Sequence, residues 1–320
     1  SHHTRTMSTT TPNPPSNPLP WNPHQYLLFQ TERNRPIHDL LSYLRLSAHP
    51  SFSPTRVADL GCGPGNSTKL LTQYFPSAKE VVGIDSSGDM LSSASKVIPE
   101  LESGPEDKRE VRFSLGDVRT WTAPEGKKPD IILANAVLHW LRHKDRIPTV
   151  VRLVRNVVAD GGVVAIQMPD NYYEWTHRAM REVAVMKGVP WEGCFPRVGY
   201  SEGESYTEER PDLDPIESME EWYQALNKVS GRVEMWTTRY VHVLRGEGCK
   251  EIVGWVRGTG LMPFLKACES EEVREAFLRE YQRKLGERYR VLGEGEVLLE
   301  YPRRFIVAWK GPSELGEEAG

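Results

Sequence analysis

The sequence predicts an α/β protein with a doubly wound, mostly parallel β-sheet. Short apolar runs of strand length alternate along the chain with amphipathic stretches of helix length, as in sheets whose parallel strands are joined by helices. One apolar run passes through a glycine-rich loop directly into a helix start, and further runs end in acidic residues. The 320 residues, 38% of them hydrophobic, are enough for one large domain or for a domain plus a cap.

The expected elements follow from these runs and their flanking turn residues. The expected strands are residues 57–60, 80–85, 111–117, 130–135, 162–168, 233–243 and 298–308. The expected helices are residues 36–46, 66–75, 88–97, 150–158, 174–187, 251–259 and 270–286. Residues 172–230 interrupt this rhythm with a helix and a Gly-, Pro- and acid-rich stretch, so we expect an insertion that covers the active site.

The glycine loop is the first candidate binding element. Residues 57–68 read V-A-D-L-G-C-G-P-G-N-S-T, which is a strand, a loop with Gly61, Gly63 and Gly65, and a helix start at Asn66. Glycine tolerates positive φ and lets the backbone approach a ligand closely. Such a loop at a helix N-terminus predicts a nucleotide-sized cradle.

Acidic residues indicate the charge of the expected ligand. Asp59 precedes the first glycine by two residues, where a dinucleotide fingerprint needs no acid and a pyrophosphate would be repelled. Asp85 ends the next apolar strand, about 20 residues further on, where ribose hydroxyls are usually held. One acid for each end of a positively charged nucleoside points to S-adenosylmethionine (SAM).

Two further segments extend this interpretation to adenine. Asp117 ends the third expected strand and can accept a hydrogen bond from the adenine amino group, while Val118 offers the backbone amide beside it. Met90, in the helix that follows the second strand, can contact the adenine ring.

The motifs resemble two nested protein families. D-L-G-C-G-P-G-N and G-I-D-S-S resemble the first two motifs of Rossmann-like SAM-dependent methyltransferases. W-N-P, A-N-A-V-L-H-W-L, Q-M-P-D-N, W-V-x-x-T-G-L and P-R-R-F-I-V-A, in this order, resemble the trans-aconitate methyltransferase family over roughly residues 21–309. The resemblance implies methyl transfer from SAM to a carboxylate of trans-aconitate or a related di- or tricarboxylic acid, which gives a monomethyl ester.

The resemblance also implies a domain plan and a cofactor site. It implies a single domain at 21–309 with a late hairpin and cap segments at about 21–50, 172–230 and 246–290. The Ser-, Thr-, Asn- and Pro-rich residues 1–20 predict a disordered tail, and we expect a flexible tail at 310–320. The residues expected to bind the cofactor are Asp59, Gly61, Gly63, Gly65, Asn66, Asp85, Ser86, Met90, Asp117, Val118, Asn135 and Ala136.

A polyanionic substrate needs hydrogen-bond donors, and arginine matches a carboxylate with two parallel bonds. The residues expected to bind the substrate are Tyr26, Arg33, His139, Trp140, Asn171, Tyr240, Arg257, Tyr301 and Arg303. One departure concerns the T-G-L segment, where bacterial members carry an arginine at the position of Met262. This leaves room for a related acid, such as an isopropylmalate-like one, or for another cation that compensates.

The expected reaction needs no general base, because a carboxylate with a pKa near 4 is ionised at neutral pH. We therefore nominate no catalytic residue, and His139 stays open as a base or as a hydrogen-bond partner of the substrate. Other functions remain open: a SAM-dependent O- or N-methyltransferase of another metabolite, and a SAM-binding module without catalysis. Hydride transfer is opposed by Asp59.

Composition restricts the partners. The formal net charge of −4 argues against nucleic acid, whose binding depends on phosphate neutralisation. No apolar run approaches the roughly 20 residues of a membrane helix, and we see no secretory signal. The four cysteines are scattered, which fits reduced thiols in the cytoplasm and predicts no metal site. We expect a monomer or weak homodimer that acts on a small carboxylic acid.

Overall fold

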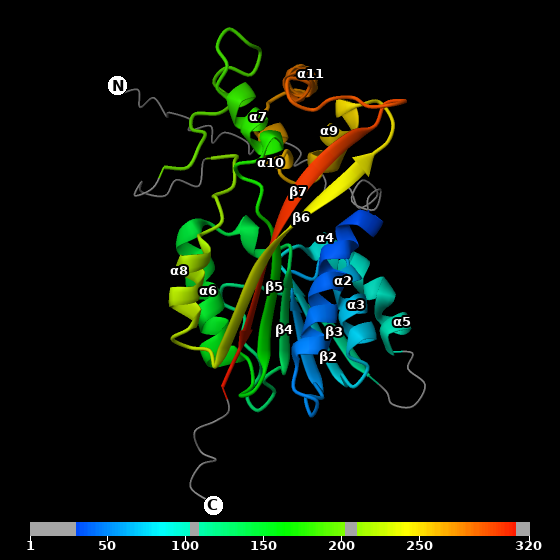
Figure 1. Cartoon of the computed structure of the whole chain (residues 1–320), viewed down its shortest axis with the longest axis vertical. Helices are drawn as coiled ribbons and strands as arrows, with labels where there is room; N and C mark the ends of the chain where they lie inside the picture. The colour runs from blue at the N-terminus through cyan, green and yellow to red at the C-terminus, as the bar shows by residue number, and fades with distance from the viewer. Residues whose placement is uncertain (1–29, 103–108, 202–209, 312–320) are drawn as a thin grey trace, which may run out of the picture.

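A seven-stranded sheet forms the centre of the molecule in the computed structural model, which describes residues 30–102, 109–201 and 210–311 (Figure 1). Its strands are β1 (Arg56–Leu60), β2 (Glu80–Asp85), β3 (Glu110–Leu115), β4 (Ile131–Asn135), β5 (Val163–Pro169), β6 (Arg232–Leu244) and β7 (Val297–Trp309). Their spatial order is β3-β2-β1-β4-β5-β7-β6.

The first five strands are parallel, and the last two form an antiparallel hairpin that joins the sheet through β7. The chain starts in the middle at β1, proceeds outward to β3, and then returns to add β4 and β5 on the other side. This reversal places the carboxyl ends of β1 and β4 side by side, which is the usual ligand position in an open α/β sheet. The predicted doubly wound α/β sheet with a late hairpin is confirmed.

Helices cover both faces of the sheet and form a separate lobe. The helices and helical turns are α2 (Gln30–Ser47), α3 (Asn66–Tyr74), α4 (Gly88–Ala94), η1 (Ser95–Val97), α5 (Ile98–Glu102), η2 (Leu138–Trp140), α6 (His143–Arg152), η3 (Leu153–Val157), α7 (Trp175–Ala184), α8 (Met219–Leu226), α9 (Cys249–Arg257), α10 (Met262–Ala267) and α11 (Glu271–Leu285). Residues 116–130 join β3 to β4 without a helix.

Alternation along the strands builds two cores. In β4, Ile131 and Leu133 pack with α2 and α3 on one face, while Ile132 and Ala134 pack with α6 and α8 on the other. Because both faces of the inner strands are buried, their sequences are almost entirely apolar.

A third core lies in the lobe of α7, α9, α10 and α11, above the carboxyl ends of the parallel strands (Figure 1). The 13-residue strands β6 and β7 extend beyond the sheet into this lobe, so one hairpin belongs to both parts. The lobe covers the sheet edge at which the acidic strand ends lie, as expected for an α-rich cap.

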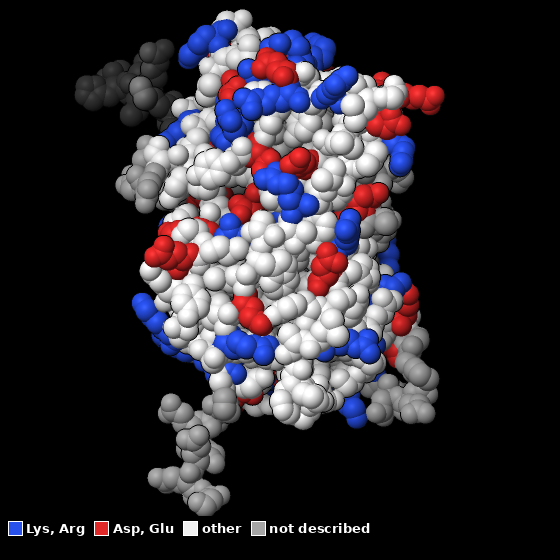
Figure 2. Space-filling view, viewed as in Figure 1, with Lys and Arg blue, Asp and Glu red and all other residues white. Residues whose placement is uncertain are grey.

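Surface charges are mixed. On the face shown in Figure 2, basic and acidic side chains lie interspersed, and neither sign forms a continuous field. Among the helices of the described residues, none is long and apolar enough to cross a membrane.

Candidate active site

A cavity of about 630 Å³ lies between the carboxyl ends of the parallel strands, α2 and the lobe. It brings together sixteen of the residues singled out in the sequence. Those expected to bind the cofactor are Gly61, Gly63, Asn66, Asp85, Ser86, Met90, Asp117, Val118, Asn135 and Ala136, and those expected to bind the substrate are Arg33, His139, Trp140, Asn171, Tyr301 and Arg303. Its size is within the range of small-molecule sites.

The glycine loop forms the floor of one half of the cavity. The backbone N–H groups of Gly61 and Cys62 donate to the carbonyl of Ile84, at 2.7 and 3.0 Å, which ties the loop to the end of β2. Gly61 has a φ of +71°, and a Cβ there would lie 2.4 Å from the side chain of Val137, so only glycine fits. Gly63 also has a positive φ, and its missing Cβ leaves open space toward the cavity.

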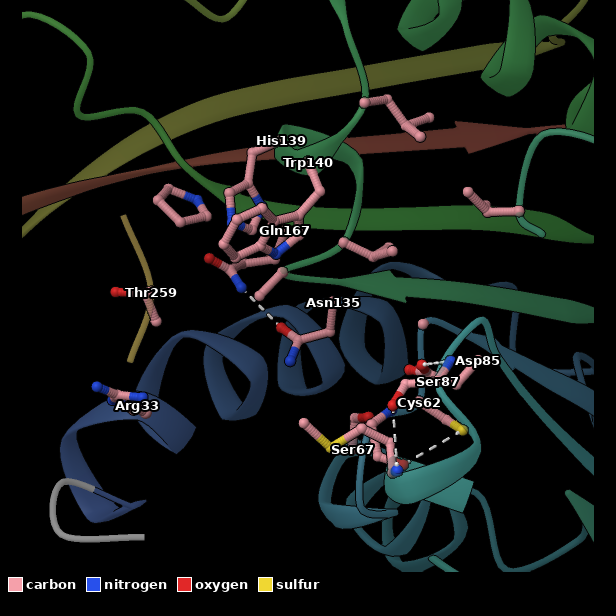
Figure 3. Close-up of a pocket in the computed structure, with 18 of the residues that line it drawn as sticks. Arg33, Cys62, Ser67, Asp85, Ser87, Asn135, His139, Trp140, Gln167 and Thr259 are labelled. Carbon is pink, nitrogen blue, oxygen red and sulfur yellow. Dashed lines mark hydrogen bonds between the residues drawn. The ribbon is translucent and has the colours of Figure 1, made fainter. Parts of the chain in front are cut away.

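Asp85 links the loop to the helix that follows β2. One carboxylate oxygen accepts from the N–H of Gly63 at 2.8 Å, and the other accepts from the N–H of Ser87 at 2.9 Å (Figure 3). Each oxygen keeps a second lone pair for another donor. The carboxylate is therefore held in place at the cavity wall and can still bind a pair of hydroxyl groups.

Asp59 does not face the cavity, and its expected role as a direct ligand contact is corrected here. The side chain is fully buried under α3, where one carboxylate oxygen accepts from the hydroxyls of Ser67 at 2.7 Å and Thr68 at 2.6 Å. Burial raises its pKa to about 6, although these two hydrogen bonds oppose the shift. Asp59 fixes the first turn of α3 beneath the glycine loop.

Gly65 also supports the loop and does not line the cavity. It is the N-cap residue of α3 with a φ of +90°, and a Cβ there would lie 3.0 Å from the side chain of Val97. Its role is to let the chain turn from the loop into the helix.

Asp117 lies at the cavity edge beyond β3. Its carboxylate accepts from the backbone N–H and the guanidinium of Arg119, and the hydrogen bonds from Arg119 lower its pKa. Asp117 is thus ionised and oriented next to the backbone amide of Val118, as a contact for an amino group requires.

The far half of the cavity is lined by cations on aromatic rings. The Arg303 guanidinium lies 4.9 Å from the ring centre of Tyr301, and that of Arg33 lies 5.3 Å from the ring centre of Trp255. The two rings meet edge to face at 5.7 Å, and Arg33 also donates to the carbonyl of Trp255 at 2.8 Å. Arg303 is 6% exposed, so its charge acts in a low-dielectric surrounding.

A chain of side-chain hydrogen bonds joins β7, β5 and β4 across this half. Arg303 donates to the side-chain oxygen of Gln167 at 3.3 Å, and the side-chain nitrogen of Gln167 donates to the side-chain oxygen of Asn135 at 2.7 Å (Figure 3). The next residue, Ala136, has a φ of +55°, which is strained for a residue other than glycine, and its N–H donates to the carbonyl of Gln167 at 2.7 Å.

Two uncharged histidines complete the wall. Burial lowers the pKa of His139 well below its usual value, and the positive charges of Arg303 and Arg146 lower it further. Burial and Arg181 lower the pKa of His177 to about 3. Neither imidazole is protonated at neutral pH, and such low pKa values make both weak bases.

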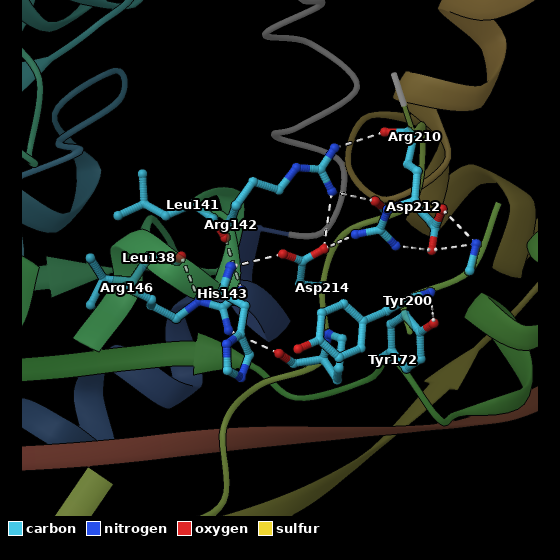
Figure 4. Close-up of polar contacts among 12 residues, drawn as sticks. Leu138, Leu141, Arg142, His143, Arg146, Tyr172, Tyr200, Arg210, Asp212 and Asp214 are labelled. Carbon is cyan, nitrogen blue, oxygen red and sulfur yellow. Dashed lines mark hydrogen bonds and ion pairs between the residues drawn. The ribbon is translucent and has the colours of Figure 1, made fainter. Parts of the chain in front are cut away.

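A buried ion pair holds the turn that carries His139 and Trp140 (Figure 4). Arg146 is fully buried and donates to the carbonyls of Leu138 at 3.1 Å and Leu141 at 2.9 Å, at the two ends of this turn. It also donates to the carbonyl of Pro215 and to the carboxylate of Glu217, both at 2.9 Å.

Arg142 makes a parallel set of contacts to the same segment. It donates to the carbonyls of Arg210 and Asp212 and to the carboxylate of Asp214, which also accepts from the N–H of His143 at 2.8 Å. These contacts pin residues 210–217 beside the cavity, where Leu213 reaches its wall.

The comparisons with known proteins agree with this geometry. Residues 57–162 match the family model described as a methyltransferase domain. The trans-aconitate 2-methyltransferases of Variovorax paradoxus and Delftia acidovorans are 41% and 40% identical to this chain, over 91% and 92% of it and 99% and 100% of their own lengths. This chain belongs to the trans-aconitate 2-methyltransferase family. It is accordingly a SAM-dependent methyltransferase.

Solved structures show the same fold at low sequence identity. Loganic acid methyltransferase with S-adenosylhomocysteine has a TM-score of 0.54 at 14% identity, covering 92% of this chain and 95% of that one. A methyltransferase-like protein of Bacillus halodurans has a TM-score of 0.50 at 14% identity, covering 85% and 99%. The Rossmann-like methyltransferase fold of this family member is therefore established.

The cavity suits the cofactor of this family. The side-chain nitrogen of Asn66 is buried at the start of α3 and has no partner among the described residues, so it is available to a ligand carboxylate. The open side of Gly63 and the free lone pairs of Asp85 lie next to it. These residues would suit SAM, and Arg33 and Arg303 in the other half would suit an anionic methyl acceptor, so the two parts are called the cofactor half and the acceptor half.

Of the expected substrate contacts within the described residues, Tyr240 and Arg257 do not line the cavity. Tyr240 faces away, because it lies on the side of β6 that packs on α2, where its hydroxyl donates to Asp39 at 2.6 Å. Arg257 follows Trp255 by two residues, about 200° around α9, so it faces solvent and pairs with Glu275. Tyr26 lies outside the described residues.

Sequence reasoning missed several wall residues. Trp255, Gln167, His177 and Lys266 line the cavity but were not assigned to it. Gln167 carried a readable signal, because it is a polar residue near the carboxyl end of an otherwise apolar strand. The others depend on how the lobe folds back over the sheet.

Proposed function

We propose that this protein transfers the methyl group of SAM to one carboxylate of trans-aconitate or a closely related di- or tricarboxylic acid. The products are a monomethyl ester and S-adenosylhomocysteine. The observation that carries the proposal is the pair Arg33 and Arg303, held on adjoining aromatic rings in the acceptor half of the cavity. Relatives that are named for trans-aconitate, and that align over nearly their whole length, support the same substrate class.

When bound, the cofactor would supply a methyl group on a sulfonium sulfur. As a carboxylate oxygen of the acceptor forms the new O–CH₃ bond, the S–CH₃ bond breaks, and the electron pair of the S–CH₃ bond stays on sulfur. No proton is removed when the acceptor is a carboxylate, which is ionised at neutral pH. The low pKa values of His139 and His177 are consistent with a site that needs no strong base.

The chain's own contribution is binding, orientation and exclusion of water. Arg33 and Arg303 balance the acceptor's negative charge, and bidentate arginine contacts fix its orientation. Trp140, Trp255 and Tyr301 replace water around the reacting oxygen with apolar surface, which strengthens these charge contacts. Holding the two reactants in line provides most of the remaining rate increase.

Lys266 supports an acceptor with more than two carboxylates. It lies on the outer wall of the cavity, one helical turn after Met262 on α10. Residues at this spacing share a helix face, so Lys266 can supply a cation close to the position at which bacterial members carry arginine.

We also propose that the protein acts in the cytoplasm and that its partner is a small carboxylic acid. All four cysteines are free in the structure, which supports a reducing compartment.

The test compares Arg303 with a matched arginine outside the cavity. Arg303→Ala removes a charge-assisted contact worth about 1.5–3 kcal/mol, so the KM for trans-aconitate rises roughly tenfold or more while the KM for SAM is unchanged. Arg257→Ala is the control, because Arg257 is only partly buried, does not line the cavity, and lies 3.9 Å from its ion-pair partner Glu275. Equal effects of the two substitutions on the acid's KM would contradict the proposed acceptor site.

A further inference from the structure

Gln167 is a buried polar side chain in a buried strand. It is 1% exposed, and the other residues of β5 are buried and almost all apolar. Gln167 pairs with Asn135 across β4 and β5 and with Phe305 across β5 and β7. Arg303 lies two residues from Phe305, on the same side of β7, so these strands bring the three polar side chains together.

The arginine decides how both amide groups are oriented. A guanidinium only donates hydrogen bonds, so the atom of Gln167 that faces Arg303 must be its oxygen. The nitrogen of Gln167 then faces Asn135, and the atom of Asn135 that receives it must also be an oxygen. The orientation of Asn135 therefore follows from the charge of Arg303, two hydrogen bonds away.

The remaining donor of this chain is directed at the cavity. Asn135 lines the cavity at the carboxyl end of β4, and its side-chain nitrogen has no hydrogen-bond partner within the described part of the chain. Figure 3 shows this nitrogen on the side of the amide away from Gln167. Figure 3 shows Asn135 between Asp85 and Cys62 on one side and His139 and Gln167 on the other, so this residue, expected from the sequence to bind the cofactor, also borders the acceptor half.

We propose that Gln167 is a positioning residue, which holds Asn135 so that its amide N–H donates to the acceptor carboxylate while Arg303 binds the same molecule. This inference rests on the proposed function and assigns a specific role within the same site. It makes the two contacts interdependent, because the arginine that binds the acid also fixes the orientation of the asparagine.

The structure supports the rigidity that this role requires. Ala136 has a strained φ of +55°, and its N–H donates to the backbone carbonyl of Gln167 at 2.7 Å. Gln167 thus holds the end of β4 through both its backbone and its side chain. Strained backbone of this kind persists where the surroundings determine it, and it is common at functional sites.

The experiment is a double-mutant cycle between Asn135 and Gln167. The variants are Asn135→Ala, Gln167→Glu and the double variant, and the two readouts are kcat/KM for trans-aconitate and the dissociation constant of trans-aconitate on enzyme loaded with S-adenosylhomocysteine. In Gln167→Glu the new carboxylate accepts from both neighbours, so Asn135 turns its nitrogen toward position 167 and its oxygen toward the acceptor.

Asn135→Ala alone should lower kcat/KM about tenfold, since one hydrogen bond to a charged group is lost. In the Gln167→Glu background the same substitution should leave kcat/KM unchanged or raise it, because it removes a misdirected oxygen. Arg303 is paired with the new carboxylate in both members of that comparison, so its effect cancels. An equal loss from Asn135→Ala in both backgrounds would overturn the inference.

Two further variants keep the test decisive. If Gln167→Glu does not fold, Gln167→Met removes both hydrogen bonds without adding charge, and the loss from Asn135→Ala must then be smaller in that background. Met168→Leu, the neighbouring buried residue on the opposite face of β5, should change neither readout. A wild-type enzyme that forms no ester refutes the proposed function itself, whereas ester formation with additive losses refutes only the role of Gln167.

Discussion

Asp85 offers the sharpest single test of the cofactor half. Its two carboxylate oxygens each accept one backbone N–H, from Gly63 and from Ser87. Asn has one acceptor oxygen and one donor nitrogen, so Asp85→Asn must turn its NH₂ group toward one of these N–H groups in either orientation. The substitution keeps the side chain's size but breaks one loop contact and removes the charge that we expect to bind the ribose hydroxyls.

The expected loss follows from these contacts. A hydrogen bond to a charged group is worth about 1.5–3 kcal/mol, which corresponds to a roughly 10- to 150-fold rise in the dissociation constant. Isothermal titration calorimetry with S-adenosylhomocysteine measures it directly.

The matched control is Glu80→Gln, at the opposite end of the same strand, where the carboxylate pairs with Arg56 and Lys127 outside the cavity. Glu80→Gln should bind S-adenosylhomocysteine as wild type does. If Asp85→Asn also bound it with wild-type affinity, with its thermal transition intact, the assignment of Asp85 to the ribose would be refuted.

Three further predictions concern buried ionisable side chains. Arg146→Met leaves the carboxylate of Glu217 buried without its cation, so the free energy of unfolding should fall by about 3–5 kcal/mol. Adding Glu217→Gln should restore part of this loss. An unchanged melting temperature of the Arg146→Met variant would contradict the prediction. Because the pKa of Asp59 rises to about 6 on folding, the free energy of unfolding should fall by about 3 kcal/mol as pH rises from about 4 to above 6. Asp59→Asn should abolish this dependence on pH. The same change in melting temperature between pH 4.5 and 7 in both proteins would count against the prediction. His139→Gln should lower kcat only modestly, and the kcat of the wild-type protein should stay constant between pH 6.5 and 9. A wild-type kcat that rises with pH in this range, and that no longer does so in the variant, would identify His139 as a base.

The sheet and the cofactor half could be predicted because their signals are local. Gly61, Gly63 and Asp85 lie within short segments whose order along the chain determines the strand ends at which they meet. Asp59 shows the limit of this reasoning. Its position was read correctly, but whether a residue at a strand end faces the ligand or the helix beneath depends on side-chain direction, and here Ser67 and Thr68 bind it.

The acceptor half is built from segments far apart in sequence, so it was predicted only in part. Arg33 and Arg303 line the cavity, while Tyr240 and Arg257 do not. Tyr240 lies on an edge strand, where a shift of one residue moves a side chain to the opposite face. Arg257 is separated from the wall residue Trp255 by half a turn of helix. Neither fact can be read from a motif string, because both depend on how the lobe sits on the hairpin.

In the proposed reaction the acceptor atom is a carboxylate oxygen. The most direct measurement incubates the wild-type protein with methyl-labelled SAM and a panel of di- and tricarboxylic acids, each beside its alcohol or amide analogue, and identifies the products by mass spectrometry. We expect a labelled monomethyl ester of trans-aconitate or a related acid, which mild alkali hydrolyses with release of labelled methanol. A labelled product that survives alkali, formed from an alcohol or amine while the acids stay unmodified, would contradict it.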